Sequence, residues 1–91
     1  MKHVVRKHLF FSGRVQGVGF RYRALSLARE YHLTGFVTNL WDGRVQMQVQ
    51  GDEDAIYAMI TALGKQRFIE IEDLEMHDLP LDVEETKFSV R

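Results

Sequence analysis

The chain has 91 residues, enough for one domain with a modest core, and its 45% hydrophobic content is typical of a folded globular protein. It contains no cysteine, which excludes disulfides, zinc–thiolate sites and cysteine nucleophiles. The formal net charge is -1, so the whole surface is not that of a nucleic-acid-binding protein, and any anion site must be local. We therefore expect a single domain over residues 1–91.

The first eight residues, MKHVVRKH, are basic, but no apolar stretch of the length that a signal peptide needs follows them. No segment approaches the length and hydrophobicity of a membrane span. Together with the absence of cysteine, these features predict a cytoplasmic protein without a membrane anchor.

The chain then predicts a strand followed by a helix. Leu9 and Phe11 fall on one face of a strand expected over residues 8–13. A helix is expected over residues 20–31, because apolar residues recur there at the spacing of one helical face. The residues of this stripe are Phe20, Ala24, Leu27, Ala28 and Tyr31.

A hairpin follows the first helix. A strand over residues 35–40 leads into Trp41-Asp42-Gly43, whose Asp-Gly pair is typical of a tight turn. We expect Trp41 at the hairpin tip to pack on a neighbour, with a lid over a bound ligand as the alternative. The next strand, over residues 44–50, alternates cleanly. Its inward residues are Val45, Met47 and Val49, and its outward residues are Gln46, Gln48 and Gln50.

The third strand is followed by a second helix. Asp52 is the expected N-cap, with Glu53 and Asp54 favourably placed in the first turn, where the helix dipole is positive. One apolar face contains Ile56, Met59, Ile60 and Leu63. We expect this helix to end at Gly64.

The remaining segment is less regular. Residues 68–79 are strand-like, but their alternation changes phase between Ile71 and Leu74, which indicates a β-bulge or a strand that begins only near Ile71. Residues 86–91 predict a short final strand, with Phe88 and Val90 on one face. The order β-α-β-β-α-β plus a short strand predicts an α+β, ferredoxin-like sandwich: a mainly antiparallel sheet with both helices on one face.

The run GRVQGVGFR at residues 13–21 connects the first strand to the first helix. It contains three glycines and no proline, so its main-chain N–H groups are free to point inward. A helix that starts near Phe20 adds the unpaired N–H groups and the positive dipole end of its N-terminus. With the guanidinium of Arg21, the loop predicts a cradle for a small dianion such as a phosphate group.

Asn39, near the end of the second strand, is the candidate for positioning a water molecule. An amide both donates and accepts hydrogen bonds, so it can orient water without acting as a strong base. The sequence shows no obvious general acid. A carboxylate leaving group, with a pKa of about 4, needs no protonation. An arginine–asparagine site therefore suits acyl phosphates better than ordinary phosphomonoesters.

These segments resemble the acylphosphatase family. GRVQGVGFR at residues 13–21 is similar to the family's phosphate-loop signature, and GFVTNLWDGRVQMQVQG at residues 35–51 is similar to its second signature. The resemblance spans essentially the whole chain, and the order of elements agrees. Thr38 is a departure, because the family usually has a longer residue directly before the asparagine.

The resemblance implies an enzyme that hydrolyses the carboxyl-phosphate bond of small acyl phosphates without a metal, a cofactor or a phosphoenzyme. It implies that Arg21 binds the phosphate and that Asn39 orients the attacking water. The loop residues whose N–H groups would contact the phosphate are Gln16, Gly17, Val18, Gly19 and Phe20. We expect a monomer that binds inorganic phosphate or sulfate in this loop and has no nucleic-acid or membrane partner.

Two non-catalytic alternatives share this order of elements. RNA-recognition motifs stack bases on aromatic residues of the open sheet face, where this chain offers three glutamines and Phe10. The other alternative is a regulatory or protein-interaction domain that lost turnover. An acylphosphatase-like domain also occurs, by family resemblance, at the front of a large hydrogenase-maturation carbamoyltransferase. The chain end at Arg91 favours a stand-alone enzyme, and the Arg21–Asn39 pair argues against lost activity.

Overall fold

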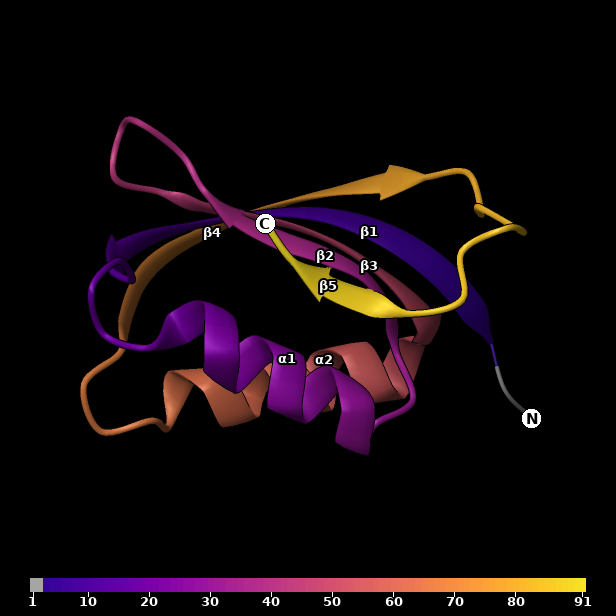
Figure 1. The fold of residues 1–91 in the computed structure, drawn as a ribbon, viewed down its shortest axis with the longest axis horizontal. Helices are drawn as coiled ribbons and strands as arrows, with labels where there is room; N and C mark the ends of the chain where they lie inside the picture. Colours follow the sequence, from indigo (N-terminus) through magenta and orange to yellow (C-terminus); the bar gives the residue numbers. More distant parts are fainter. Residues whose placement is uncertain (1–2) are drawn as a thin grey trace.

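The computed structural model describes residues 3–91 as one five-stranded sheet with two helices on one face (Figure 1). In chain order the elements are β1 Val4–Arg14, α1 Phe20–Glu30, β2 Thr34–Asn39, β3 Val45–Asp52, α2 Glu53–Gly64, β4 Glu70–Leu79 and β5 Phe88–Val90. This order confirms the predicted ferredoxin-like α+β fold. Neither helix within residues 3–91 is long and apolar enough to cross a membrane.

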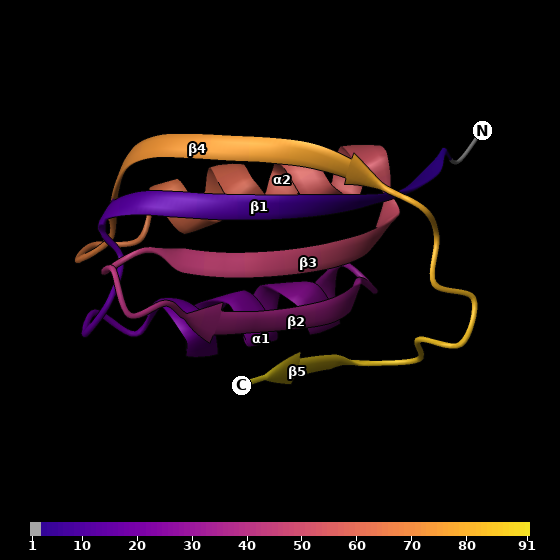
Figure 2. The ribbon, with the colours of Figure 1, turned by 90° about the horizontal axis from the view of Figure 1, so that it is seen from above.

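The strands lie in the order β4-β1-β3-β2-β5 (Figure 2). The pairs β1–β3, β1–β4 and β2–β3 are antiparallel, whereas β2–β5 is parallel. Because β1 and β2 are both antiparallel to the β3 strand between them, they run in the same direction. The loop that follows β1 and the end of β2 therefore lie at the same end of the sheet.

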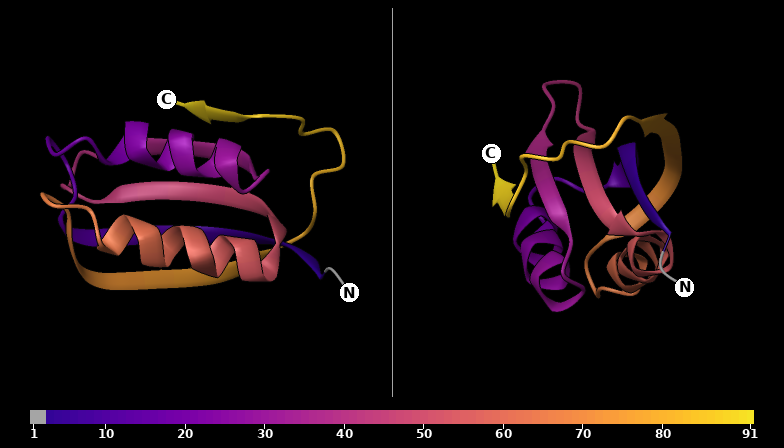
Figure 3. Two further views of the ribbon diagram at one scale, coloured as in Figure 1. Left: turned by 90° about the horizontal axis from the view of Figure 1, so that it is seen from below. Right: turned by 90° about the vertical axis from the view of Figure 1, so that its right-hand side faces the viewer.

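The core lies between the sheet and the two helices, which run side by side under one face of the sheet (Figure 3). The predicted alternation of β3 is confirmed, since its three inward residues are fully buried. The predicted apolar stripes of the two helices are confirmed in part, because Leu27, Tyr31 and Ile60 are only half-buried, at the margin of the core. The fully buried stripe residues are Phe20, Ala24, Ala28, Ile56, Met59 and Leu63.

The first strand begins at Val4, four residues earlier than the sequence pattern predicts. The sequence pattern did not predict these first residues of the strand, because they include Arg6 and Lys7 and charged residues rarely lie in the buried part of a strand. Here both are buried and paired with acids far along the chain. Arg6 donates to both carboxylate oxygens of Glu85, at 2.7 and 3.0 Å, and Lys7 pairs with Asp78.

The β-bulge predicted in the fourth strand is confirmed. Ser12 pairs with Asp73 but Gly13 pairs with Ile71, so Glu72 has no partner on β1. Gly13 has φ 121°, and a Cβ there would lie 2.3 Å from the main-chain oxygen of Glu70. Gly13 lies within β1, as predicted, but the strand continues one residue further, to Arg14.

Asp52 occupies the N-cap position of α2, as predicted, but its side chain does not cap the helix. Its Oδ1 instead accepts a hydrogen bond from the N–H of His3 at 3.3 Å, and the N–H of Glu53 donates to the His3 oxygen at 2.9 Å. The start of the chain therefore takes the place of the cap. The helix ends at Gly64, as predicted.

Candidate active site

The loop between β1 and α1 covers residues 15–19. Val15 is buried and anchors the loop in the core, while Gly17 and Gly19 are exposed. Both glycines are left-handed, with φ 71° and 80°, and a Cβ at either would meet no atom within 4 Å. The loop therefore needs glycine for its backbone conformation rather than for space, and its outer side is open.

Gly19 is the N-cap of α1, and no side chain caps the helix. The first main-chain hydrogen bond of the helix runs from the N–H of Arg23 to the oxygen of Gly19 at 3.0 Å. The N–H groups before Arg23 in this turn have no helical acceptor, and the turn contains no acidic residue. The positive end of α1 is thus available to an anion from solution.

The side chain of Gln16 ties this loop to the β2–β3 hairpin. Its Nε2 donates to the main-chain oxygens of Leu40 and Arg44, at 2.7 and 2.9 Å. Leu40 follows Asn39 directly in the chain. The sequence predicts only a main-chain role for Gln16, because the partners of its side chain lie 24 and 28 residues away.

Arg21 lies on the first turn of α1, and its Nη1 donates to the main-chain oxygen of Arg91 at 2.9 Å. Arg91 is itself held on β2: its N–H donates to the oxygen of Val37 at 2.8 Å, and its guanidinium lies 3.9 Å from the ring centre of Phe36. Within residues 3–91, Arg21 forms no ion pair with an acid. Its remaining N–H groups are therefore available to a ligand.

Asn39 is the last residue of β2 and is exposed. It pairs in register with Val45, so its side chain belongs to the helix side of the sheet. Its amide makes no side-chain hydrogen bond within residues 3–91. The neighbouring Thr38 lies on the opposite face, opposite Gln46. The strand directions bring the end of β2, and with it Asn39, to the end of the sheet where the β1–α1 loop lies. Figures 1 and 2 show the end of β2 and this loop at the same end of the sheet.

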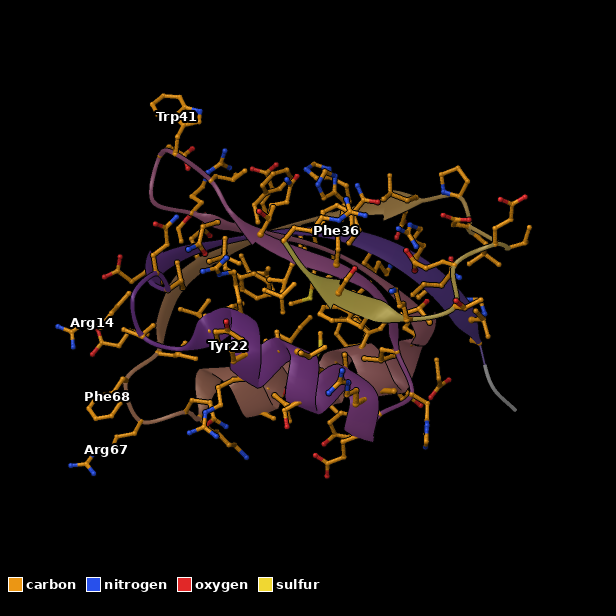
Figure 4. The ribbon with its side chains drawn as sticks, in the orientation of Figure 1. Arg14, Tyr22, Phe36, Trp41, Arg67 and Phe68 are labelled. Carbon is orange, nitrogen blue, oxygen red and sulfur yellow. The ribbon has the colours of Figure 1, made fainter. Side chains whose placement is uncertain are left out.

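The hairpin beyond Asn39 has the tight turn that Asp42-Gly43 predicts. Asp42 accepts hydrogen bonds from the main-chain N–H of Arg44 at 3.1 Å and from its Nε at 2.8 Å. These hydrogen bonds hold the pKa of Asp42 below its usual value. The bond from the main-chain N–H of Arg44 has the larger effect, and the bond from its guanidinium has the smaller one. Trp41 is 97% exposed and projects from the hairpin tip (Figure 4). The expectation that Trp41 packs on a neighbour is therefore wrong, and its side chain does not cover the loop either.

A hollow of about 420 Å³ lies elsewhere, beside the start of β1 and the end of β4. It contains the paired side chains of Lys7, Glu53 and Asp78 and none of the candidate residues. Within residues 3–91, no group of three His, Asp or Glu side chains is arranged to hold a metal ion.

Residues 7–90 match the family model described as Acylphosphatase. The chain belongs to the acylphosphatase family. A relative from Bifidobacterium longum, named acylphosphatase, is 40% identical over 98% of this chain and 94% of its own length. Another of the same name, from Clostridium perfringens, is 41% identical over 94% of this chain and 98% of its own. Both signature segments lie within the matched region, which confirms the resemblance read from the sequence.

A solved acylphosphatase structure shows the same architecture. The crystal structure of the acylphosphatase from Bacillus subtilis superposes with a TM-score of 0.87, at 30% identity, over 98% of this chain and 99% of that chain. The acylphosphatase fold of this chain, with its β1–α1 loop and its β2–β3 hairpin, is thus shared with a protein of almost the same length.

Proposed function

We propose that this chain hydrolyses small acyl phosphates to a carboxylate and inorganic phosphate, without a metal ion. Family membership supports the reaction class. The single observation that carries the proposal at residue level is the loop–helix junction, where an uncapped helix N-terminus, two left-handed glycines and Arg21 meet without an acid in the helix's first turn.

In this proposal the phosphoryl group lies against the main-chain N–H groups of residues 16–20. These groups and the dipole of α1 offset the negative charge of the phosphate. Arg21 contributes a charge-assisted contact from the N–H groups that Arg91 does not use. The hydrogen bond to Arg91 orients the guanidinium, so that less side-chain freedom is lost when phosphate binds.

Asn39 positions the attacking water. Its amide accepts a hydrogen bond from the water or donates one to it, which aims an oxygen lone pair at phosphorus. The water oxygen forms the new P–O bond as the bond between phosphorus and the carboxyl oxygen breaks. The leaving carboxylate keeps the electron pair, and the proton of the water passes to a phosphoryl oxygen.

The leaving group decides the substrate class. A carboxylate has a pKa of about 4 and departs as an anion, so the reaction needs no general acid. Preorganised N–H donors stabilise the charge on the transferring phosphoryl group, and this term dominates catalysis of phosphoryl transfer. We propose that the enzyme acts as a monomer.

The test is turnover of acetyl phosphate and benzoyl phosphate by purified protein in EDTA, with p-nitrophenyl phosphate as the control. We expect both acyl phosphates to be hydrolysed well above their spontaneous rates, and the phenyl ester to be hydrolysed poorly because its leaving group is a weaker one. Turnover that requires an added divalent metal, or none above the spontaneous rate, contradicts the proposal.

A further inference from the structure

The amide of Gln16 uses both of its N–H groups on the β2–β3 hairpin. Its Nε2 lies 2.7 Å from the oxygen of Leu40 and 2.9 Å from that of Arg44, in a partly buried position. The same two oxygens close the hairpin: Leu40 accepts from the N–H of Gly43 at 3.3 Å, and Arg44 accepts from the N–H of Leu40 at 2.8 Å. Gln16 therefore binds the closing pair of the turn rather than its tip.

The two ends of this contact lie next to the two proposed functional groups. The main chain of Gln16 belongs to the phosphate loop, and Leu40 is joined to Asn39 by one peptide bond. A donor with two acceptors on different residues constrains orientation as well as distance. The separation between the bound phosphoryl group and the water-orienting amide thus depends on this glutamine side chain as well as on the pairing of β1 and β2 with β3.

We infer that Gln16 is a positioning residue that fixes Asn39 relative to the phosphate loop. The inference rests on the proposed function and deepens it. A loss of this contact leaves the N–H groups of the loop and Arg21 in place, so phosphate still binds. It lets the end of β2 move relative to the phosphate, and a displacement of about 1 Å can lower the rate roughly a hundredfold.

Side-chain chemistry makes glutamine specific for this task. Methionine matches the length of glutamine but cannot donate a hydrogen bond. Asparagine is one methylene shorter and cannot span both acceptors. Gln50 offers a matched control, because its Nε2 also donates to a main-chain oxygen, that of Asp82 at 3.0 Å. Gln50 pairs with Thr34 at the start of β2, the end opposite to Asn39.

The experiment compares Gln16→Met and Gln50→Met, each in the wild-type and the Asn39→Ala backgrounds. It measures kcat for benzoyl phosphate and the inhibition constant of inorganic phosphate. We expect Gln16→Met to lower kcat at least tenfold and to change the phosphate inhibition constant less than threefold. In the Asn39→Ala background the same substitution should lower kcat less than twofold, because the group that it positions is absent. Gln50→Met should leave both constants within twofold.

An equal loss of kcat in both backgrounds overturns the inference, and so does an unchanged kcat with weakened phosphate inhibition. A merely structural role would lower the unfolding midpoint in urea but leave the kcat of the folded protein intact. If Gln16→Met does not fold, Gln16→Asn takes its place with the same expected pattern. Wild-type protein without turnover would refute the proposed function and this inference together, whereas active wild type with full activity in Gln16→Met refutes only the inference.

Discussion

Arg21 carries the only side-chain charge that we place in contact with substrate. One of its five N–H groups is used on the main-chain oxygen of Arg91, which leaves a fixed but incompletely satisfied guanidinium beside the helix N-terminus. The helix dipole disfavours a cation at this end of α1, so the position is unfavourable unless an anion binds there.

Replacing Arg21 with alanine should therefore weaken inhibition by inorganic phosphate. Hydrogen bonds to charged groups contribute about 1.5–3 kcal/mol, so the inhibition constant should rise roughly tenfold to a hundredfold. Arg23→Ala is the control, since that side chain is exposed two residues further along the same helix, about 200° around its axis from Arg21. Equal phosphate affinity in wild type and Arg21→Ala would place the anion elsewhere.

The proposed role of Asn39 predicts a different kinetic pattern. Asn39→Ala removes the group that orients water but leaves every proposed phosphate contact, so kcat should fall roughly a hundredfold while KM changes little. Steady-state kinetics with benzoyl phosphate measure both constants, and Thr38→Ala, on the opposite face of β2, is the control. A normal kcat with a raised KM would assign Asn39 to binding instead.

Among single residues, the sequence predicts those functional candidates that lie within one continuous motif. The loop and Arg21 are recognisable within one run, and Asn39 within a second. The contacts of Gln16 and the support of Arg21 by Arg91 could not be predicted, because they join residues 24 to 70 positions apart. Such contacts depend on strand order, which neither motif contains.

The β1–β4 bulge is the element that holds the end of β1 before the loop. A side chain at Gly13 would lie 2.3 Å from the main-chain oxygen of Glu70 and 2.8 Å from the nitrogen of Glu72 on β4, and Glu70 cannot move aside without disturbing its pairing with Arg14. The positive φ adds a conformational cost for any other residue.

Gly13→Ala should accordingly lower the free energy of unfolding by roughly 3 kcal/mol, the sum of overpacking and backbone strain. Gly43→Ala is the matched control: it has φ 94° but open space around its Cβ, so it should cost only about 1 kcal/mol. Urea unfolding monitored by circular dichroism measures both. Equal losses would show that the contact with β4 contributes nothing.

The elements themselves were largely predictable, because periodicity and turn residues are local signals. Both helices, the hairpin and the bulge between Ile71 and Leu74 are where the pattern placed them. The start of β1 was missed, because Arg6 and Lys7 are neutralised by acids more than 70 residues away. Capping by Asp52 was wrong for a similar reason, since His3 competes for its carboxylate.

Across the whole molecule, the sheet face opposite the helices is partly covered. The two phenylalanines on this face, Phe10 and Phe36, lie under the guanidinium groups of Arg44 and Arg91. The connection between β4 and β5 crosses the same face and places Glu85 on Arg6. The aromatic rings on which an RNA-recognition motif would stack bases are thus in contact with the protein's own arginines. The three glutamines of β3 on the same face offer no aromatic ring for stacking either.

The stability of the molecule should have a broad plateau around neutral pH. The hydrogen bond with Lys7 is the main cause that lowers the pKa of Asp78 below 3.8, and the same bond raises the pKa of Lys7 above 10.5. The Asp78 contribution is present above its unfolded pKa and is lost as pH falls through the folded one. The Lys7 contribution is present below 10.5 and is lost as pH rises through its folded pKa.

Urea unfolding at a series of pH values checks this prediction. We expect Asp78→Asn to lower stability at neutral pH and to flatten part of both the acid and the alkaline limbs, because both pKa shifts come from one pair. Glu72→Gln, an exposed acid in the bulge of the same strand, is the control. If the acid limb is identical in Asp78→Asn and wild type, the Lys7–Asp78 pair does not contribute to the loss of stability at low pH.

The most direct measurement is a crystal structure of the protein with bound phosphate. We predict an anion between the N–H groups of residues 16–20 and the guanidinium of Arg21, with an ordered water joined to the amide of Asn39. Phosphate bound elsewhere, for instance in the hollow beside Lys7, with the loop left empty, would contradict the proposed site and every residue role that follows from it.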